Sequence, residues 1–245
     1  MEIPSELKKT LRSARRVMVL SGAGVSAESG VPTFRDALTG HWARFRPEDL
    51  ATPEAFRRNP KLVWDWYAAR RAQLNQVTPN PGHHALVAME QRVLDFLLAT
   101  QNVDGLHARA GSRRVLELHG NISRVKCFSE EVVIPDWVET GETPPRCPRC
   151  GGWLRPDVVW FNEALPAATF EECLAGSAQC EVFISVGTSA LVYPAASLPL
   201  EALRAGAVVV EVNPQETPLT ARAHYFLAGP SGQVLPALVA EVWPE

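Results

Sequence analysis

A glycine-rich turn near the N-terminus has the spacing of a dinucleotide-binding loop. The apolar residues 17–20 predict a short buried parallel strand, and Gly22, Ala23, Gly24 and Ala27 follow it in the pattern G-x-G-x-x-G/A. In such a turn the absence of bulky side chains lets backbone N–H groups approach a pyrophosphate. A plain turn between a strand and a helix could have the same residues, so the spacing alone leaves both interpretations open.

A histidine after another predicted strand is a candidate general base. Residues 114–118 are predicted to form a strand, and His119 follows them directly, before Gly120. The ordinary pKa of histidine lies near neutrality, so this side chain can accept a proton in one step and return it in the next. The alternative is a histidine that only fills the core or faces the solvent.

Small and polar residues follow three further predicted strands, at the strand ends where α/β sheets bind ligands. They are Gln101, Asn102 and Asp104 after strand 94–99, Gly187, Thr188 and Ser189 after strand 182–186, and Asn213, Pro214 and Gln215 after strand 207–212. Their amide, carboxylate and hydroxyl groups can pair with ribose hydroxyls, a carboxamide or phosphate oxygens. Turns and helix caps are the alternative use of the same residue types.

Three of the five cysteines are candidate metal ligands. Cys147 and Cys150 form a C-x-x-C pair, whose two thiolates can face one ion, and Cys127 precedes them. The expected second C-x-x-C pair is incomplete, because Glu130 stands three residues after Cys127. Glu130 could complete a tetrahedral zinc site through oxygen, water could fill the fourth position, or the metal could have been lost.

The predicted strands alternate with predicted helices, which cover 5–16, 83–92, 103–110, 167–176, 195–205 and 234–242. This order indicates the α/β class, with a Rossmann-like doubly wound parallel sheet. Two stretches, 37–79 and 124–157, interrupt the alternation and need packing of their own. A dehydrogenase of this type would have an acidic residue at the end of the next strand, roughly 20 residues after the glycines, and this chain has no strand there.

The string GAGVSAESGVPTFR, residues 22–35, resembles the signature of the sirtuins, a family of NAD-dependent protein-lysine deacylases. Further matches follow in sirtuin order: QNVD at 101–104, LHG at 118–120, VVWF at 158–161, GTS at 187–189 and VNP at 212–214. The resemblance implies a Rossmann-like NAD-binding domain made of residues 1–36, 80–123 and 158–245. It also implies a smaller inserted domain made of 37–79 and 124–157, with a helical module and a zinc-ribbon-like module.

The resemblance implies roles for the residues described above. His119 would be the catalytic residue of a reaction whose products are free lysine, nicotinamide and an O-acyl-ADP-ribose. The residues that bind NAD, the co-substrate, would be Gly22, Ala23, Gly24, Ser26, Ala27, Glu28, Thr33, Phe34, Arg35, Gln101, Asn102, Asp104, Gly187, Thr188, Ser189, Asn213, Pro214, Gln215 and Ser231. Phe34 and Arg35 would belong to a loop over the cofactor.

A tyrosine and an arginine in the first insertion suggest which acyl group is removed. Tyr67 and Arg70 are three residues apart on a helix predicted over 59–75, so both lie on one face and could bind a carboxylate together. An exposed helix face is the alternative. The Y-x-x-R pair, with Ala51 sixteen residues before Tyr67, matches the branch of sirtuins that remove succinyl and malonyl groups. The resemblance therefore implies faster desuccinylation and demalonylation than deacetylation.

The segment Val158–Phe161 is predicted to form an exposed edge strand. Sirtuins bind the acyl-lysine peptide along this segment by strand addition, so Val159, Trp160 and Phe161 would contact the substrate. The family pattern continues with Gly-Glu, whereas this chain has Asn162 before its glutamate, and asparagine also tolerates a left-handed backbone.

The net charge and the lengths of the apolar runs restrict the kinds of partner that this protein can bind directly. The chain has 245 residues and a formal charge of −3, which favours neither nucleic acid nor an anionic membrane as a direct partner. No apolar run is long enough to cross a bilayer, so we expect a cytoplasmic protein. We also expect a monomer. The family resemblance implies that its partners are acyl-lysine proteins or peptides. Two other functions stay open: an NAD-binding regulatory protein that reads acyl-lysine with little turnover, and a protein ADP-ribosyltransferase.

Overall fold

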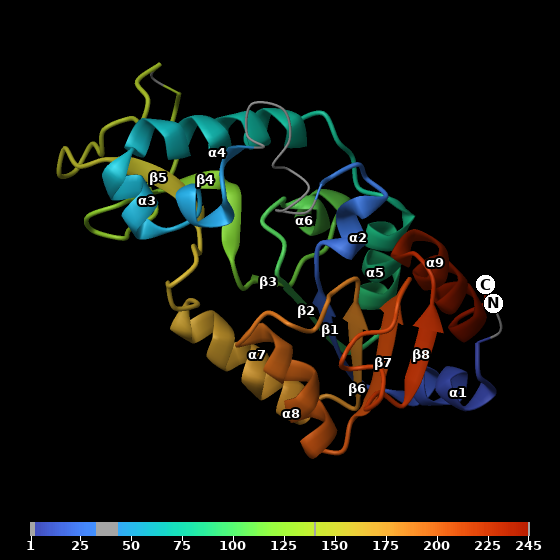
Figure 1. The fold of residues 1–245 in the computed structure, drawn as a ribbon. Helices are drawn as coiled ribbons and strands as arrows, with labels where there is room; N and C mark the ends of the chain where they lie inside the picture. Colours follow the sequence, from blue (N-terminus) through green and yellow to red (C-terminus); the bar gives the residue numbers. More distant parts are fainter. Residues whose placement is uncertain (1–2, 33–43, 140, 245) are drawn as a thin grey trace.

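The computed structural model describes residues 3–32, 44–139 and 141–244, and its centre is a parallel sheet of six strands (Figure 1). The strand order is β3-β2-β1-β6-β7-β8, and every neighbouring pair is parallel. The strands are β1 (Arg16–Ser21), β2 (Asp95–Thr100), β3 (Val115–Glu117), β6 (Val182–Val186), β7 (Val208–Asn213) and β8 (Tyr225–Ala228). The predicted α/β class with a doubly wound sheet is confirmed.

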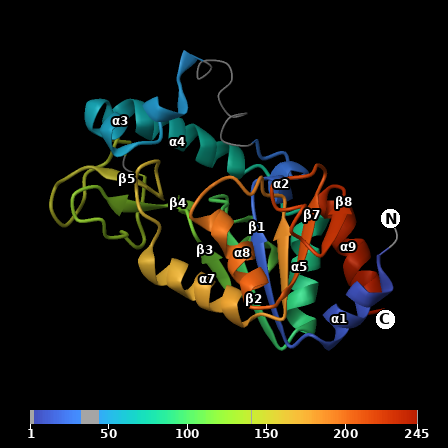
Figure 2. The same ribbon diagram turned by 60° about the horizontal axis from the view of Figure 1, so that its bottom comes forward.

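Helices cover both faces of this sheet, which explains why its central strands are apolar throughout (Figures 1 and 2). Alternate residues of β1 belong to different cores: Val17 and Val19 to one, Met18 and Leu20 to the other. The first core packs under α1 (Ser5–Ser13), α5 (Pro81–Arg92) and α9 (Ser231–Val242), and the second under α7 (Ala167–Gln179) and α8 (Leu198–Arg204).

The order of the strands reverses at β1, which lies between β2 and β6. The chain builds the sheet outward in one direction through β2 and β3, and in the other through β6, β7 and β8. A crevice forms at such a reversal beside the carboxyl ends of the strands, and α/β proteins bind their ligands there. The short helices α2 (Gly24–Ala27) and α6 (Leu106–Ala110) follow β1 and β2 at this edge.

A second, smaller group of elements lies beside this edge (Figure 1). It contains an antiparallel pair of strands, β4 (Gly120–Cys127) and β5 (Leu154–Val158), with α3 (Pro53–Arg58), α4 (Pro60–Leu74) and the 3₁₀ turn η2 (Pro47–Asp49). These elements have two apolar cores of their own, one of which includes Phe56, Trp66 and Trp160. The division into two domains with the predicted boundaries stays a prediction.

Several predicted elements differ from those in the structure. The predicted helix 195–205 is a 3₁₀ turn, η3 (Ala195–Ser197), followed by α8. The predicted helix 103–110 begins only at Leu106, because Gly105 has a left-handed backbone (φ 71°) and ends the preceding turn. The first helix ends at Ser13, because the chain enters β1 at Arg16. Strands β4 and β8 and helix α3 were not predicted.

None of the helices in the described ranges is both long and apolar enough to span a lipid bilayer.

Candidate active site

The glycine turn after β1 packs against the loop after β6. Gly22 N–H donates to the Val186 carbonyl oxygen (2.9 Å), and Gly24 N–H donates to the Gly187 carbonyl oxygen (2.8 Å). A Cβ on Gly24 would lie 2.7 Å from the Gly187 Cα, and Gly187 itself has a left-handed backbone (φ 59°). The glycines are therefore required for two loop backbones to meet at the crevice.

Three of the predicted NAD-binding residues form a buried polar network below this turn. Ser26 Oγ donates to Asp104 Oδ2 (2.8 Å), and Asn102 Nδ2 donates to Ser26 Oγ (3.1 Å). Asp104 also accepts from the Leu106 N–H (2.9 Å), which fixes its orientation. Burial raises the pKa of Asp104. The network joins the amide and carboxylate of the loop after β2 to the hydroxyl of a residue in α2.

His119 is held by its ring nitrogen. His119 Nδ1 lies 2.9 Å from the Gln101 carbonyl oxygen, which can only accept a hydrogen bond, so Nδ1 carries the proton in the neutral ring. Nε2 is then the basic atom. Burial lowers the pKa of His119, and the hydrogen bond to Gln101 partly offsets this effect, so the ring is neutral at neutral pH. The Gln101 side chain donates to Thr188 Oγ1 (2.9 Å) and links two of the predicted loops.

The residues predicted to bind the distal part of NAD lie at the ends of β7 and α9. Asn213 Nδ2 donates to the Thr188 carbonyl oxygen (3.4 Å), while Pro214 and Gln215 are exposed. Glu28 accepts from the Gly232 N–H (2.6 Å) and from Ser231 Oγ (3.5 Å). Glu28 and Ser231 are thus brought together, and the carboxylate caps the N-terminus of α9.

A cavity of about 360 Å³ joins the large sheet to the smaller group of elements. Its wall includes residues from the predicted catalytic, cofactor and acyl sites, among them Ala23, Ser26, Gln101, Asn102, Asp104, His119, Ala51, Tyr67, Arg70, Val159, Trp160 and Phe161. The roles of these residues stay predictions, but the structure brings them to one space. Thr33, Phe34 and Arg35 lie outside the described residues.

The predicted acyl-binding residues also line this cavity. Asn59 caps the N-terminus of α4 by accepting from the Leu62 N–H, and the helix has the predicted extent to within a residue. Tyr67 is buried, and its hydroxyl accepts from Trp160 Nε1 (3.1 Å). Burial raises the pKa of Tyr67 to about 12, so its hydroxyl keeps its proton. Arg70 is half-buried, with its guanidinium carbon 5.0 Å from the centre of the Trp66 ring.

The predicted edge strand Val158–Phe161 is wrong beyond its first residue, because β5 ends at Val158. Val159 N–H still donates to the His119 carbonyl oxygen (2.9 Å) beside β4, and Trp160 is buried against Phe56. Phe161 is 53% exposed. Its own N–H donates to the Ala51 carbonyl oxygen (2.9 Å) and so cannot extend a ladder to a peptide.

A buried ion pair holds the turn that follows. Asn162 has the left-handed backbone that its residue type permits (φ 70°). Glu163 accepts from the Trp160 N–H (2.8 Å) and from both terminal nitrogens of Arg155 (2.5 and 2.9 Å). The Arg155 guanidinium also stacks on the Trp160 ring, with its carbon 3.3 Å from the ring centre. Sequence patterns gave no sign of this pair, because an arginine within a short strand is expected to face solvent.

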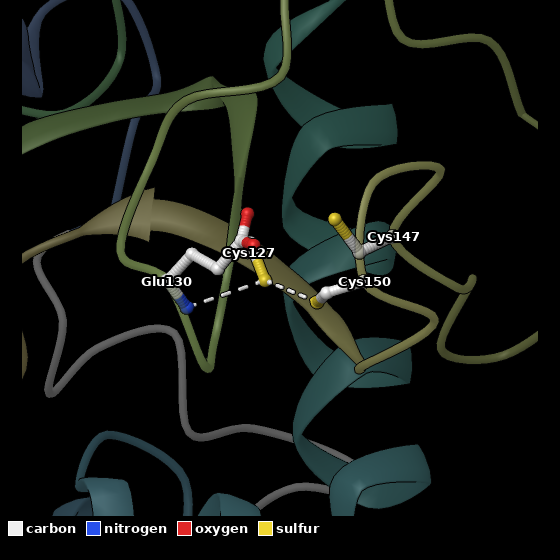
Figure 3. A group of neighbouring side chains, drawn as sticks. All are labelled: Cys127, Glu130, Cys147 and Cys150. Carbon is white, nitrogen blue, oxygen red and sulfur yellow. Dashed lines mark hydrogen bonds between the residues drawn. The ribbon is translucent and has the colours of Figure 1, made fainter.

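The predicted metal ligands converge in the smaller group of elements (Figure 3). One ligand atom from each of Cys127, Glu130, Cys147 and Cys150 lies within 4.8 Å of the others, the only such group among the residues the structure describes. Three sulfur atoms and a carboxylate oxygen match the donor types that zinc binds. The donor set therefore fits a structural zinc ion, while the identity of the fourth ligand stays open at this point.

Two buried histidines behind the cavity were not singled out from the sequence. His107 Nε2 lies 2.8 Å from Ser21 Oγ, and His83 Nε2 lies 3.4 Å from Ser26 Oγ. Burial lowers the pKa of His83 to about 4 and that of His107 to about 3. The sequence contains a weak signal for His83, because this residue stands three positions after Asn80, which caps helix α5. In the structure the His83 ring accepts a hydrogen bond from the Asn80 N–H.

The structure agrees with the sirtuin family that the motifs suggest. It has a glycine turn at the strand reversal, a polar crevice there, and a group of cysteines inserted beside the sheet. The sequence model described as Sir2 family matches residues 22–194 of this chain. The chain therefore belongs to the Sir2 family, the family also known as sirtuins, and the predicted family is confirmed.

Curated relatives and solved structures agree with this assignment. NAD-dependent protein deacylase 1 of Pseudomonas aeruginosa is 50% identical in an alignment of 242 positions that covers 96% of this chain and 97% of the relative. An NAD-dependent protein deacylase of Thermus thermophilus is 51% identical over 93% of this chain and 90% of the relative. A solved structure of a Sir2 homolog–NAD complex has a TM-score of 0.91 at 45% identity, covering 98% of this chain and 94% of that chain.

Proposed function

We propose that this protein is an NAD-dependent protein-lysine deacylase that removes succinyl and malonyl groups faster than acetyl groups. At the coarser level, the predicted NAD-dependent deacylase agrees with the family and with the names of relatives about 50% identical over nearly the whole chain. A mutant Sir2 homologue in complex with ADP ribose (44% identity, TM-score 0.90) supports the proposed co-substrate. The preference for succinyl and malonyl groups goes beyond what the names of these relatives state.

One observation carries the proposal. The cavity of about 360 Å³ is lined by both a histidine base, His119, and a cation, Arg70. A lysine bearing a short acidic acyl group needs both: a base for the reaction at its amide, and a cation for its distal carboxylate. Only a cavity shared by the two groups lets one substrate reach them together.

The chain's own residues would bind NAD and orient its reactive part. The glycine turn offers close backbone approach for the phosphates, and Asn102 and Asp104 offer amide and carboxylate groups for the carboxamide and ribose. Bound NAD would supply an electrophilic sugar carbon with nicotinamide as leaving group. The polar network would fix its orientation, since an unpaired buried polar group costs about 1–3 kcal/mol.

His119 would act as a base through Nε2. The Gln101 carbonyl holds the proton on Nδ1, so Nε2 has a free lone pair at neutral pH. This atom would accept the proton of a ribose hydroxyl of bound NAD and return a proton later to the leaving lysine amine. The low pKa of the buried ring keeps the base form populated, although it also weakens the base.

Ala51, Tyr67 and Arg70 would determine the acyl group. The small side chain of Ala51 leaves room in the wall, and the neutral Tyr67 hydroxyl can donate its hydrogen to a carboxylate while it accepts from Trp160. The Arg70 guanidinium supplies the opposite charge. Charge-assisted hydrogen bonds of this kind contribute about 1.5–3 kcal/mol, or roughly 10- to 150-fold in affinity.

The test is a panel of peptides that carry succinyl-, malonyl-, acetyl- or butyryl-lysine, assayed with NAD for nicotinamide release and for free lysine. We expect kcat/KM for the two acidic groups to exceed that for acetyl and butyryl by roughly tenfold or more. The acyl preference is refuted if acetyl-lysine is the best substrate. Nicotinamide release without free lysine would instead indicate ADP-ribosyl transfer.

The role of His119 is tested by His119→Ala, with the exposed His84→Ala as the control. We expect His119→Ala to lose turnover on every peptide while NAD binding, measured by calorimetry, is retained. Full turnover in His119→Ala would refute the mechanism, and lost turnover in His84→Ala would show that the assay reports folding rather than catalysis.

A further inference from the structure

We propose that Cys127, Glu130, Cys147 and Cys150 form a zinc centre in which the Glu130 carboxylate is the fourth ligand. Zinc binds sulfur at about 2.3 Å and oxygen at about 2.1 Å, so tetrahedral ligand atoms lie roughly 3.5–3.8 Å apart. The four ligand atoms here are all within 4.8 Å of one another, and the sulfurs of Cys127 and Cys150 are 3.4 Å apart. Small side-chain movements therefore suffice to surround one ion.

Glu130 occupies the position that a cysteine would take in a second C-x-x-C turn. Glu130 follows Cys127 by three residues, as Cys150 follows Cys147, and both turns direct backbone N–H groups at sulfur. The Glu130 N–H donates to Cys127 Sγ (3.4 Å), and the backbone N–H of Cys150 lies against the Cys147 sulfur. Such turns orient a side chain three residues later toward the same ion as the first thiolate.

The two turns are fixed to each other by backbone contacts. Phe128 N–H donates to the Trp153 carbonyl oxygen (2.9 Å), and Trp153 in turn forms a bridge with Arg146, the residue before Cys147. These contacts hold the backbones of the two turns together, and the Glu130 carboxylate lies near the three sulfur atoms (Figure 3).

Arg149 completes the centre as a positioning residue. Its Nε lies 3.0 Å from Glu130 Oε2, which leaves the other carboxylate oxygen for the ion. Three thiolates, one carboxylate and Zn²⁺ have a net charge of −2, and the guanidinium offsets part of it. Partners of this kind orient a ligand and raise metal affinity, typically about 10- to 100-fold.

The two sides of the centre differ in exposure. Cys127 and Cys147 are buried in an apolar core with Trp64 and Leu154, whereas Cys150 and Glu130 are exposed. A carboxylate is also a harder, less tightly held ligand for zinc than a thiolate. We therefore expect the ion to enter and leave on the Glu130 side, and to exchange faster than from a site with four cysteines.

The experiment measures zinc binding in the full chain without NAD or peptide, so its outcome is independent of the proposed function. Metal-stripped protein is titrated with zinc against a chromophoric chelator, for wild type, Glu130→Gln, Glu130→Cys, Arg149→Met and, as a charge-matched control, the neighbouring exposed Glu131→Gln. Zinc-edge X-ray absorption of the loaded protein counts sulfur and oxygen neighbours, and circular dichroism checks that each variant folds.

We expect one zinc per wild-type chain, with three sulfur neighbours and one oxygen neighbour. Affinity should fall about tenfold or more in Glu130→Gln and Arg149→Met, rise in Glu130→Cys with four sulfur neighbours, and be unchanged in Glu131→Gln. Equal affinity of Glu130→Gln and wild type would overturn the proposal in favour of water as fourth ligand. A wild-type chain that binds no zinc would overturn it in favour of a lost metal site.

Discussion

Replacing Arg70 by methionine should abolish most of the preference for acidic acyl groups. Methionine keeps an unbranched apolar side chain along Trp66 but removes the charge that faces the cavity. The guanidinium is half-buried, so its hydrogen bonds to a carboxylate are weakly screened and worth about 1.5–3 kcal/mol. The variant should therefore lose roughly 10- to 150-fold in kcat/KM for succinyl- and malonyl-lysine peptides.

The same variant should leave kcat/KM for acetyl- and butyryl-lysine within about threefold of wild type, because these groups have no carboxylate for Arg70 to bind. Lys61→Met is the matched control, since Lys61 is an exposed cation on the same helix and pairs with Asp65 (2.6 Å). Arg70→Lys should recover part of the preference, since lysine keeps the charge but not the planar fork. An unchanged ratio of succinyl to acetyl turnover in Arg70→Met would refute the reasoning, and an equal fall for all four peptides would assign Arg70 a structural role.

Three further predictions concern the walls of the same cavity. Tyr67→Phe leaves the buried Trp160 N–H without its acceptor, so the free energy of unfolding in urea should fall by about 1–3 kcal/mol and succinyl turnover should fall more than acetyl turnover. Gly24→Ala places a Cβ 2.7 Å from the backbone of the opposing loop, so NAD affinity measured by calorimetry should fall while the chain stays folded. Burial lowers the pKa of His107 to about 3 in the folded protein, so acid protonates this residue first in the unfolded state. The contribution of His107 to the free energy of unfolding is therefore constant above about pH 6.5. Below that pH it falls by up to about 1.4 kcal/mol per pH unit. Urea unfolding at pH 7 and pH 5 should show a smaller acid loss in His107→Gln than in wild type.

The large sheet was predicted well from the sequence because its strands are buried on both faces. In an α/β protein a short continuous apolar run, such as residues 182–186, typically forms a buried strand of the parallel sheet. The strands β1, β2, β6 and β7 were therefore predicted to within a residue or two of their observed bounds. Strand β8 has only four residues, two of them half-buried, and its pattern is too short to separate from a turn. Strand β4 is irregular, with a register shift between Asn121 and Val125 that breaks the alternation of buried residues.

The candidate site was predicted in its residue types but not in its contacts. The motifs pointed to Ser26, Asn102 and Asp104 as NAD-binding residues, but not to the hydrogen bonds that join them over 76–78 positions of sequence. The motifs also assigned Tyr67 and Trp160 separate roles, for the acyl group and the peptide. In the structure the two side chains are hydrogen-bonded to each other, because tertiary packing buries the indole that an edge strand would have exposed.

Helix α4 connects the proposed acyl site with the proposed zinc centre. Its residue Trp64 is fully buried in the core that holds Cys127 and Cys147, while Tyr67, one turn later, faces the cavity. Arg70 follows after a second turn on the same side. Because these three residues belong to one helix, a change in the packing of the cysteine core against Trp64 would shift the whole helix. The groups proposed to bind the acyl carboxylate would then move with it. The proposed zinc ion would therefore affect which acyl group is removed without taking part in catalysis.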